Sequence, residues 1–374
     1  MKHIFILGGS KEQLDLIFEA KRFYFIIHLF DSNENCYARK YSDYFYNISI
    51  SNKEEILTEA IRIKPLIVTT IATEIGNITA CYVAQKLGLN TNSYDVAINT
   101  TNKFKMKNIL NDNNIKTAKA SIISKETINW DIIPAIIKPI DSSAGRGISY
   151  VKYLEDITNE KIDNALQFSK SKKVLIEEYI KGKQFSIETV SSKGEHHLVA
   201  ITEEYTSLPP NIIETKQLIP ARIDDKLKER IKHFGFQILN AFKIEFGAAH
   251  IEIKLTENND LYVIELASRM GGWRSELINF SLGINYVQLH LLSLLGKDIN
   301  FKPSKDETAI VKLIISKEDY DELSEFRENN SSYLIDDIDM NTFKNSKHLS
   351  DLNGFYFIHI QNKDDISKFI EEHH

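Results

Sequence analysis

Short apolar runs alternate with helix-like stretches over the first hundred residues. Residues 3–7 and 25–30 are apolar runs, and residues 13–21 between them carry apolar side chains at helical spacing. A second helix is predicted over residues 51–64, with Ser51 as its N-cap and Glu54 three residues later. A third strand is predicted over residues 65–70. This order predicts a parallel α/β unit over residues 1–97.

The pattern changes in the rest of the chain, where strands adjoin one another. Helices are predicted over residues 102–111 and 225–241. Extended segments are predicted over residues 116–124, 135–140, 148–153, 174–179, 185–190, 248–255 and 261–266, and residues 203–221 form a proline-containing loop. Strand, helix and strand follow at residues 308–315, 317–326 and 355–360, and would either cap a site or form a dimer face.

Composition places the chain among ordinary soluble proteins. Its 374 residues, 43% apolar and 26% charged, predict two or three packed units. A net charge of −6 without a basic stripe argues against a nucleic-acid partner. Apolar runs stay far below the ~20 residues of a membrane span, and residues 1–3 do not resemble a signal peptide. We therefore expect a cytoplasmic protein with no membrane partner.

The cysteines and histidines that might suggest a metal site do not do so here. Cys36 and Cys81 lack the spacing of metal ligands and are expected to be thiols in a reducing cytosol. The terminal His373 and His374 are either native or the remnant of a purification tag, so they enter no metal argument.

The first strand ends at Gly8-Gly9, and the second ends at Asp31, which invites a dinucleotide-binding interpretation. The stretch GGSKEQ is not the full GxGxxG fingerprint, and a strand-to-helix turn needs glycines anyway. We interpret this segment as a Rossmann-like scaffold with a tight first turn.

A second glycine-rich stretch, IIKPIDSSAGRGI at residues 136–148, carries more chemistry. It places Lys138 at the end of a predicted strand and a flexible Gly/Ser loop after it. A fixed cation followed by exposed backbone N–H groups is what a polyphosphate needs. The stretch therefore predicts a nucleotide site.

Two carboxylates lie on the last pair of predicted core strands. Glu252 and Glu265 are separated by a short polar turn, so a hairpin would bring them to one end of a cleft. Glu265 is embedded among apolar residues, where an unpaired carboxylate is costly. Mg²⁺ binds through few protein carboxylates plus phosphate and water. We predict a metal site here rather than two solvated glutamates.

Together these motifs resemble the ATP-grasp superfamily, in the carboxylate-amine ligase branch that shares its core with biotin carboxylase and carbamoyl-phosphate synthase and includes L-amino-acid ligases. The resemblance covers about residues 1–300 and rests on the order of the motifs. It implies an ATP-grasp fold with a Rossmann-like domain at residues 1–97, a linker helix and lid subdomain at 98–182, a core with the metal site at 183–300 and a C-terminal α+β subdomain at 301–374.

The resemblance also implies contacts for ATP. Lys103 in TTNKFKMK and Lys138 match the two lysines that contact the α- or β-phosphate, although Lys103 also reads as an exposed helix lysine like Lys105 and Lys107. The loop would close over the phosphates as a mobile lid, stiffened by Ala144 where relatives often carry glycine. Its contacting residues would be Ser142, Ser143, Gly145, Arg146 and Gly147.

The strand VLIEEYIKGKQ would hold the nucleoside. Glu177 would accept a hydrogen bond from the adenine amino group, and Tyr179 and Ile180 would present backbone to the ring edge. Gln184 stands where many relatives have a ribose-binding glutamate, and its amide can still bind the hydroxyls. We expect weaker nucleotide affinity as a result.

Glu252 and Glu265 match the family's two acidic ligands for Mg²⁺, with Mn²⁺ as the alternative ion. The usual asparagine is replaced by Ala267, so one ion lacks a ligand or uses Ser268 or water, and the number of ions is left open. Arg269 matches an arginine that stabilises the transferred phosphoryl group, a role that suits its planar fork. A structural salt bridge is the alternative for Arg269.

The implied reaction is a two-step ligation. ATP phosphorylates a small-molecule carboxylate to an acyl phosphate, an amine displaces phosphate, and Lys103, Lys138, Arg269 and the metal offset the charge. Glu214 is a candidate for the amine side, and His250 and Arg274 for the acid, against the alternatives of a surface carboxylate, a buried histidine and a rim arginine.

Three other functions are weighed beside the ligase. Gln184 and Ala267 favour a nucleotide-binding protein without catalysis. A carboxylase or carbamoyl-phosphate-type enzyme would need a biotin carrier or a glutaminase, and the chain has no segment that resembles either. An NAD-dependent oxidoreductase would have to bind NAD. The family also leads us to expect a homodimer.

Overall fold

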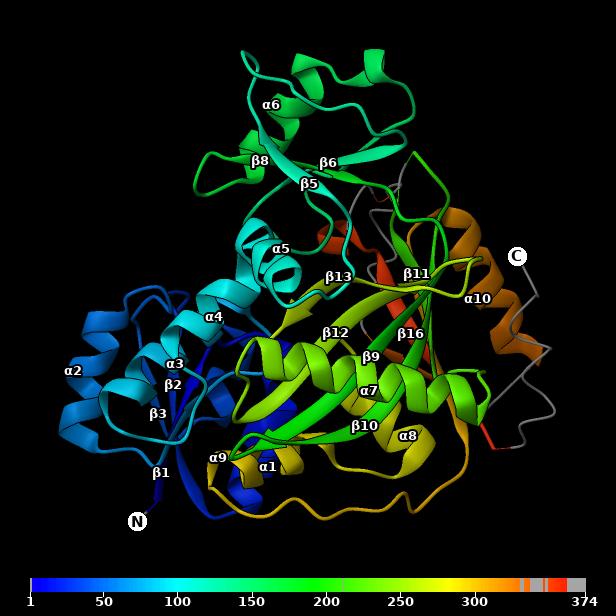
Figure 1. Ribbon diagram of the computed structural model, residues 1–374. Helices are drawn as coiled ribbons and strands as arrows, with labels where there is room; N and C mark the ends of the chain where they lie inside the picture. The colour runs from blue at the N-terminus through cyan, green and yellow to red at the C-terminus, as the bar shows by residue number, and fades with distance from the viewer. Residues whose placement is uncertain (1, 211, 330–332, 337–345, 347–348, 362–374) are drawn as a thin grey trace.

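The computed structural model describes residues 2–210, 212–329, 333–336, 346 and 349–361. Within them, one parallel and two antiparallel β-sheets organise the chain. Figure 1 shows the parallel sheet at the left, the eight-stranded antiparallel sheet at the right and the four-stranded antiparallel sheet above them. The predicted α/β class is confirmed.

The N-terminal unit is a four-stranded parallel sheet in the order β3-β2-β1-β4. Its strands are β1 Lys2–Leu7, β2 Phe25–Phe30, β3 Tyr44–Tyr46 and β4 Ile67–Thr69, and its helices are α1 Leu14–Arg22, α2 Lys53–Ile63 and α3 Glu74–Lys86. The predicted Ser51 cap is wrong. Asn52 caps α2 by accepting the N–H of Glu55, because the helix begins one residue later than predicted.

The glycine turn after β1 is filled by its own surroundings. The N–H of Gly9 donates to Asp31 Oδ2 at 2.7 Å, and a Cβ on Gly9 would lie 2.3 Å from Cys36 Sγ. The Asp31 carboxylate therefore stabilises the turn by a hydrogen bond, as the scaffold interpretation expects. Both cysteines are free thiols.

Two short helices lead from this unit to a small antiparallel sheet, which we call the lid sheet. They are α4 Tyr94–Thr101 and α5 Lys103–Asp112. The lid sheet has the order β5-β8-β6-β7, with β5 Ala120–Ile123, β6 Ala135–Pro139, β7 Ser149–Val151 and β8 Val174–Glu178. Helix α6, Asn159–Phe168, packs its buried Ile162 and Ala165 on the sheet. The glycine-rich loop connects β6 to β7.

The largest sheet has eight strands in the order β13-β12-β9-β10-β11-β14-β16-β15. Its first part comprises β9 Lys183–Ser192, β10 Glu195–Thr206, β11 Glu214–Ile219, β12 Gly247–Leu255 and β13 Leu261–Ala267. The loop predicted for residues 203–221 is therefore wrong over most of its length. Glu203 pairs with Leu218 across β10 and β11, and the prolines Pro209 and Pro210 occupy the connection between the two strands.

Helices cover both faces of this sheet. Helix α7, Asp225–Ala241, has the predicted bounds and packs Ile231 and Ile238 against Ile187 of β9. Helices α8, Arg274–Leu282, and α9, Tyr286–Leu294, pack with Val190 of the same strand. Successive strand residues face opposite sides, so even-numbered positions near Val190 face α8.

The C-terminal segment continues the same sheet. Its elements are β14 Thr308–Ile314, α10 Lys317–Asn329, β15 Tyr333–Asp336, the short helix η4 Leu349–Asp351 and β16 Gly354–Ile360. Because β14 pairs with β11, the sheet is continuous across the boundary expected at residue 300. His373 and His374 lie outside the described residues.

None of the described helices is by itself long and apolar enough to cross a membrane. Helices α8 and α9 together meet the length and composition, but the chain bends by 114° between them. Their apolar side chains, including Leu277, Tyr286 and Leu291, belong to the hydrophobic core.

Candidate functional site

A cleft of about 960 Å³ lies where the lid sheet, the largest sheet and the N-terminal unit meet. It is bordered by nearly all of the residues that the sequence singled out. From the lid and its hinge come Lys138, Ser142, Ser143, Gly145, Arg146, Glu177, Tyr179, Ile180 and Gln184. From the remaining elements come Lys103, Glu214, His250, Glu252, Glu265, Arg269 and Arg274.

Lys103 links the glycine-rich loop to the hairpin of β12 and β13. It is the first residue of α5, and its buried Nζ donates to the Ser142 carbonyl at 2.8 Å and to Glu265 Oε1 at 3.0 Å. Its charge is therefore balanced by a carboxylate within the cleft. The alternative of an exposed helix lysine is wrong for Lys103, because α5 turns this side chain inward.

Lys138 is the last residue but one of the apolar strand β6 and is also buried. It forms an ion pair with Glu177 Oε1 on the neighbouring strand β8. The second oxygen of Glu177 lies 2.9 Å from Nζ of Lys107. The Glu177 carboxylate, predicted to bind adenine, is thus held between two lysines in this structure.

The hinge between the lid and the core carries the other predicted nucleoside residues. The backbone N–H of Tyr179 donates to the Pro134 carbonyl at 2.9 Å, so this group already has a hydrogen-bond partner within the protein. The Tyr179 ring meets Tyr150 edge to face, with 5.4 Å between centroids. Gln184 donates to Glu204 Oε2 at 2.7 Å. An amide can release that bond to a hydroxyl, as the ribose prediction requires.

The glycine-rich loop borders the cleft through five of its six residues, and the predicted contact of Gly147 with ATP stays a prediction. Gly147 does not border the cavity, because it packs into the lid, where a Cβ would lie 3.0 Å from Phe168 and 3.2 Å from Ala165. Ala144 has φ = 58°, a left-handed conformation that glycine adopts without strain.

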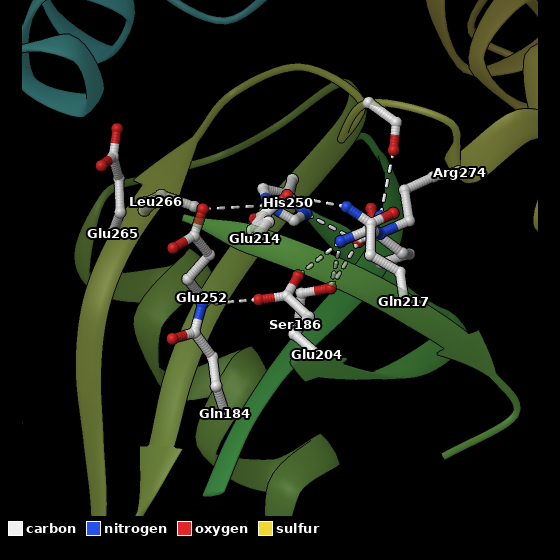
Figure 2. Close-up of polar contacts among 12 residues, drawn as sticks. Gln184, Ser186, Glu204, Glu214, Gln217, His250, Glu252, Glu265, Leu266 and Arg274 are labelled. Carbon is white, nitrogen blue, oxygen red and sulfur yellow. Dashed lines mark hydrogen bonds and ion pairs between the residues drawn. The ribbon is translucent and has the colours of Figure 1, made fainter. Parts of the chain in front are cut away.

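Glu252 and Glu265 are direct register partners on β12 and β13. Both side chains are about one-quarter exposed, 24% for Glu252 and 26% for Glu265. Figure 2 shows Glu252 between Glu265 and His250, whose Nε2 lies 3.5 Å from Glu252 Oε1. Paired carboxylates that border a cleft fit the oxygen-ligand chemistry of Mg²⁺.

The other protein groups near this pair do not extend the ligand set. The described residues contain no group of three or more His, Cys, Asp or Glu side chains placed to hold a metal ion. The suggestion that Ser268 supplies a ligand is wrong. Its buried hydroxyl is bonded to Asn77 Nδ2 at 2.8 Å and Thr100 Oγ1 at 2.9 Å, away from the cleft.

Arg269 borders the cleft, but its guanidinium is occupied. It forms an ion pair with Glu74, the first residue of α3, and also donates to the Met270 carbonyl. The structure therefore contains the salt bridge that was the alternative interpretation. The pair joins the N-terminal unit to the core beside the hairpin of β12 and β13. Because its guanidinium is held by Glu74, Arg269 would have to leave Glu74 to reach a phosphoryl group.

The floor of the cleft is a buried network centred on Arg274, whose side chain is 1% exposed. Arg274 Nε donates to Glu188 Oε1 at 3.0 Å, and its other nitrogens reach Glu204 and Gln217 (Figure 2). His250 Nδ1 lies 2.6 Å from the same Glu188 oxygen. The rim-arginine alternative for Arg274 is wrong, because Arg274 is the central cation of this network.

The network shifts the pKa values of its members in opposite directions. Burial lowers the pKa of His250, but the neighbouring Glu188 outweighs burial and raises it to about 10. Burial, together with the charges of Glu204 and Glu252, raises the pKa of Glu214 to about 8. His250 is therefore a cation at neutral pH, and Glu214 is largely protonated. Gln217 Nε2 donates to Glu214 Oε2 at 2.8 Å.

Sequence reasoning missed several residues of the cleft. Asp15 and Phe18 of α1 border it from the N-terminal unit, and Trp273 and Phe355, which meet edge to face, also border it. Glu188 and Glu204 were missed because they lie inside strands. A glutamate among apolar residues was the available signal, and it had been used only for Glu265.

In this fold a small antiparallel sheet, the lid sheet, lies at one end of a larger sheet, and the cleft lies where they meet. Residues 132–276 match the family model of the ATP-grasp domain. The chain therefore contains an ATP-grasp domain, as its motifs predicted.

Several known proteins that resemble the chain are ligases by name. Alanine--anticapsin ligase from Bacillus subtilis is 24% identical over 270 residues, which cover 64% of this chain and 57% of that protein. The chain thus spans less than two thirds of that relative's length. The crystal structure of L-amino acid ligase from Bacillus licheniformis matches with a TM-score of 0.78 at 20% identity, covering 99% of this chain and 96% of that one.

A second solved structure was determined with nucleotide. Carboxyaminoimidazole ribonucleotide synthase from Aspergillus clavatus complexed with ATP matches with a TM-score of 0.78 at 18% identity, covering 99% of this chain and 96% of that chain. At these identities the two structural likenesses establish the fold, and the ATP-grasp fold prediction is confirmed.

Proposed function

We propose that the protein is an ATP-dependent carboxylate-amine ligase. A small-molecule carboxylate oxygen attacks the γ-phosphorus of ATP, which gives an acyl phosphate and ADP. The nitrogen of an amine then attacks the acyl carbon, phosphate leaves, and the nitrogen loses a proton to form the amide. The observation that carries this proposal is the opposed pair Glu252 and Glu265 beside Lys103, in a cleft bordered by a glycine-rich lid loop.

The chain's own residues contribute positioning and charge. Lys103 and Lys138 would exchange their present carboxylate partners for phosphate oxygens, and the loop 142–147 would exclude water when it closes. Arg269 would reach the transferred phosphoryl group after releasing Glu74. These exchanges need no nucleophilic serine or cysteine, because phosphoryl transfer depends mainly on position and charge neutralisation.

Mg²⁺ is the proposed metal, with Mn²⁺ as the alternative, and Glu252 and Glu265 would hold it together with phosphate oxygens and water. When bound, the ion would neutralise charge on the phosphates. A second ion would have few protein ligands, because Ala267 supplies none and Ser268 is bonded elsewhere.

The floor network is proposed to hold the two substrates. His250 and Arg274 carry positive charge and suit the acid, although Glu188 already contacts both. Glu214 suits the amine, since a carboxylate with a pKa of about 8 can take a proton near neutral pH. The names of the relatives make amino acids the first substrates to try. We further propose a cytoplasmic homodimer that needs neither nucleic acid nor membrane.

Hydroxylamine trapping tests this function before the amine is known. The full chain is incubated with MgATP, hydroxylamine and a panel of amino acids and other small carboxylic acids. The ligase account predicts an acyl hydroxamate and an equal amount of ADP with at least one acid. Bicarbonate-dependent ADP formation without hydroxamate would favour the carboxylase. ATP binding without turnover across the panel, with amines added, would favour the non-catalytic nucleotide-binding protein suggested by Gln184 and Ala267.

A further inference from the structure

Lys107 is a buried cation beneath the nucleotide end of the cleft that the proposed reaction does not use. It lies one helical turn after Lys103, on the buried face of α5 with Met106 and Leu110. Its side chain is 4% exposed, and it does not border the cavity. A lysine at such a position needs a partner, because burial of an unpaired charge is costly.

The partners of Lys107 come from the lid and from the core. Its Nζ lies 2.9 Å from Glu177 Oε2 on lid strand β8 and donates to Thr117 Oγ1 at 3.2 Å. The Thr117 hydroxyl in turn donates to the Val263 carbonyl of β13 at 2.8 Å. Lys107 is thereby fixed at the junction of α5, the lid sheet and the hairpin of β12 and β13.

Glu177 is shared between two lysines, one on each carboxylate oxygen. Lys138 contacts Oε1 from the cleft side, and Lys107 contacts Oε2 from beneath. Burial opposes ionisation of Glu177, but the charges of Lys107 and Lys138 outweigh it and hold its pKa at about 2. The carboxylate is therefore charged at any pH at which the enzyme would work.

This sharing matters when a nucleotide arrives. To bind a phosphate, Lys138 must turn away from Glu177. If Lys138 were the only cation paired with Glu177, that movement would leave a buried carboxylate without a cation, which is strongly unfavourable. With Lys107 in place, Glu177 keeps one ion pair throughout.

We propose that Lys107 is a positioning residue of the nucleotide site, which keeps Glu177 paired so that Lys138 is free to bind a phosphate oxygen. This inference rests on the proposed function, since it assumes that Lys138 contacts a nucleotide. The nearby Lys103 and Glu265 balance each other, so the five charged groups carry a net charge of +1 with Lys107 and zero without it.

The test is the affinity of the full chain for MgADP, measured by isothermal titration calorimetry. Lys107→Met should weaken binding by about tenfold or more. Lys105→Met is the matched control, because Lys105 lies on the exposed face of the same helix, and it should bind like the wild type. Lys107→Gln, which loses the charge but keeps hydrogen-bonding capacity, replaces Lys107→Met if the latter does not fold.

A double-mutant cycle with Glu177→Gln separates positioning from a general effect on the fold. In the Glu177→Gln background there is no buried carboxylate to keep paired, so Lys107→Met should cost less than about threefold in affinity. A purely structural role, or a through-space attraction of Lys107 for the nucleotide, would give the same loss in both backgrounds. The glutamine still accepts a hydrogen bond, as the adenine contact requires.

The outcomes distinguish this inference from the proposed function. Wild-type binding with a loss in Lys107→Met that Glu177→Gln suppresses supports the inference. Wild-type binding with no loss in Lys107→Met, or an equal loss in both backgrounds, overturns the inference alone. Absence of MgADP binding by the wild type overturns both.

Discussion

The two ends of the cleft differ in their proportions of lysine and glutamate. Beneath the lid, three lysines, Lys103, Lys107 and Lys138, meet the two glutamates Glu177 and Glu265. On the floor, the carboxyl groups of four glutamates surround two cations, His250 and Arg274, with the amine of Lys254 nearby. The floor glutamates are Glu188, Glu204, Glu214 and Glu252.

The difference teaches that each end is prepared for a different partner. The lysine-rich end suits a polyanion, because Lys103 and Lys138 border the cleft and each already has a carboxylate that it can exchange for phosphate. The glutamate-rich end suits a substrate that brings a cation, and it keeps Glu214 protonated in the absence of one. Interactions between such groups are stronger in a partly dry cleft than in water.

The largest effect is expected from removing the cation at the centre of the floor. Arg274→Met would leave Glu188 and Glu204 buried without their shared partner and should lower the free energy of unfolding by about 3–5 kcal/mol. Urea denaturation measures this. Arg222→Met is the control, since the side chain of Arg222 is about one-third exposed where it pairs with Glu203 of β10, and its loss should cost less, about 1 kcal/mol. Equal losses in the two variants would contradict the floor network.

At the other end, the expected loss is in catalysis rather than in folding. Lys138→Ala and Glu265→Gln should each reduce hydroxamate formation by about a hundredfold or more, because Lys138 would offset phosphoryl charge directly and Glu265 would hold the metal ion that does so. Glu257→Gln is matched to the second variant, since Glu257 is exposed in the turn of the same hairpin, and it should keep full activity. Activity of Glu265→Gln comparable to that of Glu257→Gln would remove Glu265 from the metal site.

A further effect concerns the pH dependence of stability. The pKa of Glu214 is raised from 4.5 to about 8, so between these pH values the folded chain retains a proton that the unfolded chain has lost. The stability of the wild type relative to Glu214→Gln should therefore fall as pH rises from 4.5 to 8, by at most about 1.4 kcal/mol per pH unit. Above pH 8 the difference should become constant. A flat difference across this window would show that Glu214 ionises normally.

Much of the fold was predictable because its patterns are local. The parallel N-terminal unit, helix α7 and the hairpin of β12 and β13 follow from runs and spacings that a single segment contains. Strand β11 was missed because it contains polar residues such as Glu214 and Gln217. Their side chains point into the buried network, and only pairing with β10 and β14 makes them strand residues.

The site was predictable where its residues lie beside a motif, and not where distant strands meet. Lys103 and Lys138 border the cleft as expected, whereas Lys107 was set aside as a surface lysine. The signal for Lys107 was present, since residues 103, 106, 107 and 110 share one helix face that includes Met106 and Leu110. For Glu188 and Glu204 the only signal was a glutamate inside a strand, because their cation comes from α8, about 70 to 86 residues further along the chain.

The most direct test of the central claim follows the oxygen atoms of the substrate. An acid that gives a hydroxamate is labelled with ¹⁸O in its carboxylate and incubated with MgATP and hydroxylamine, and the released phosphate is analysed by mass spectrometry. An acyl phosphate requires that each phosphate carry one ¹⁸O from the acid. Release of unlabelled phosphate alongside hydroxamate would contradict carboxylate phosphorylation in this cleft.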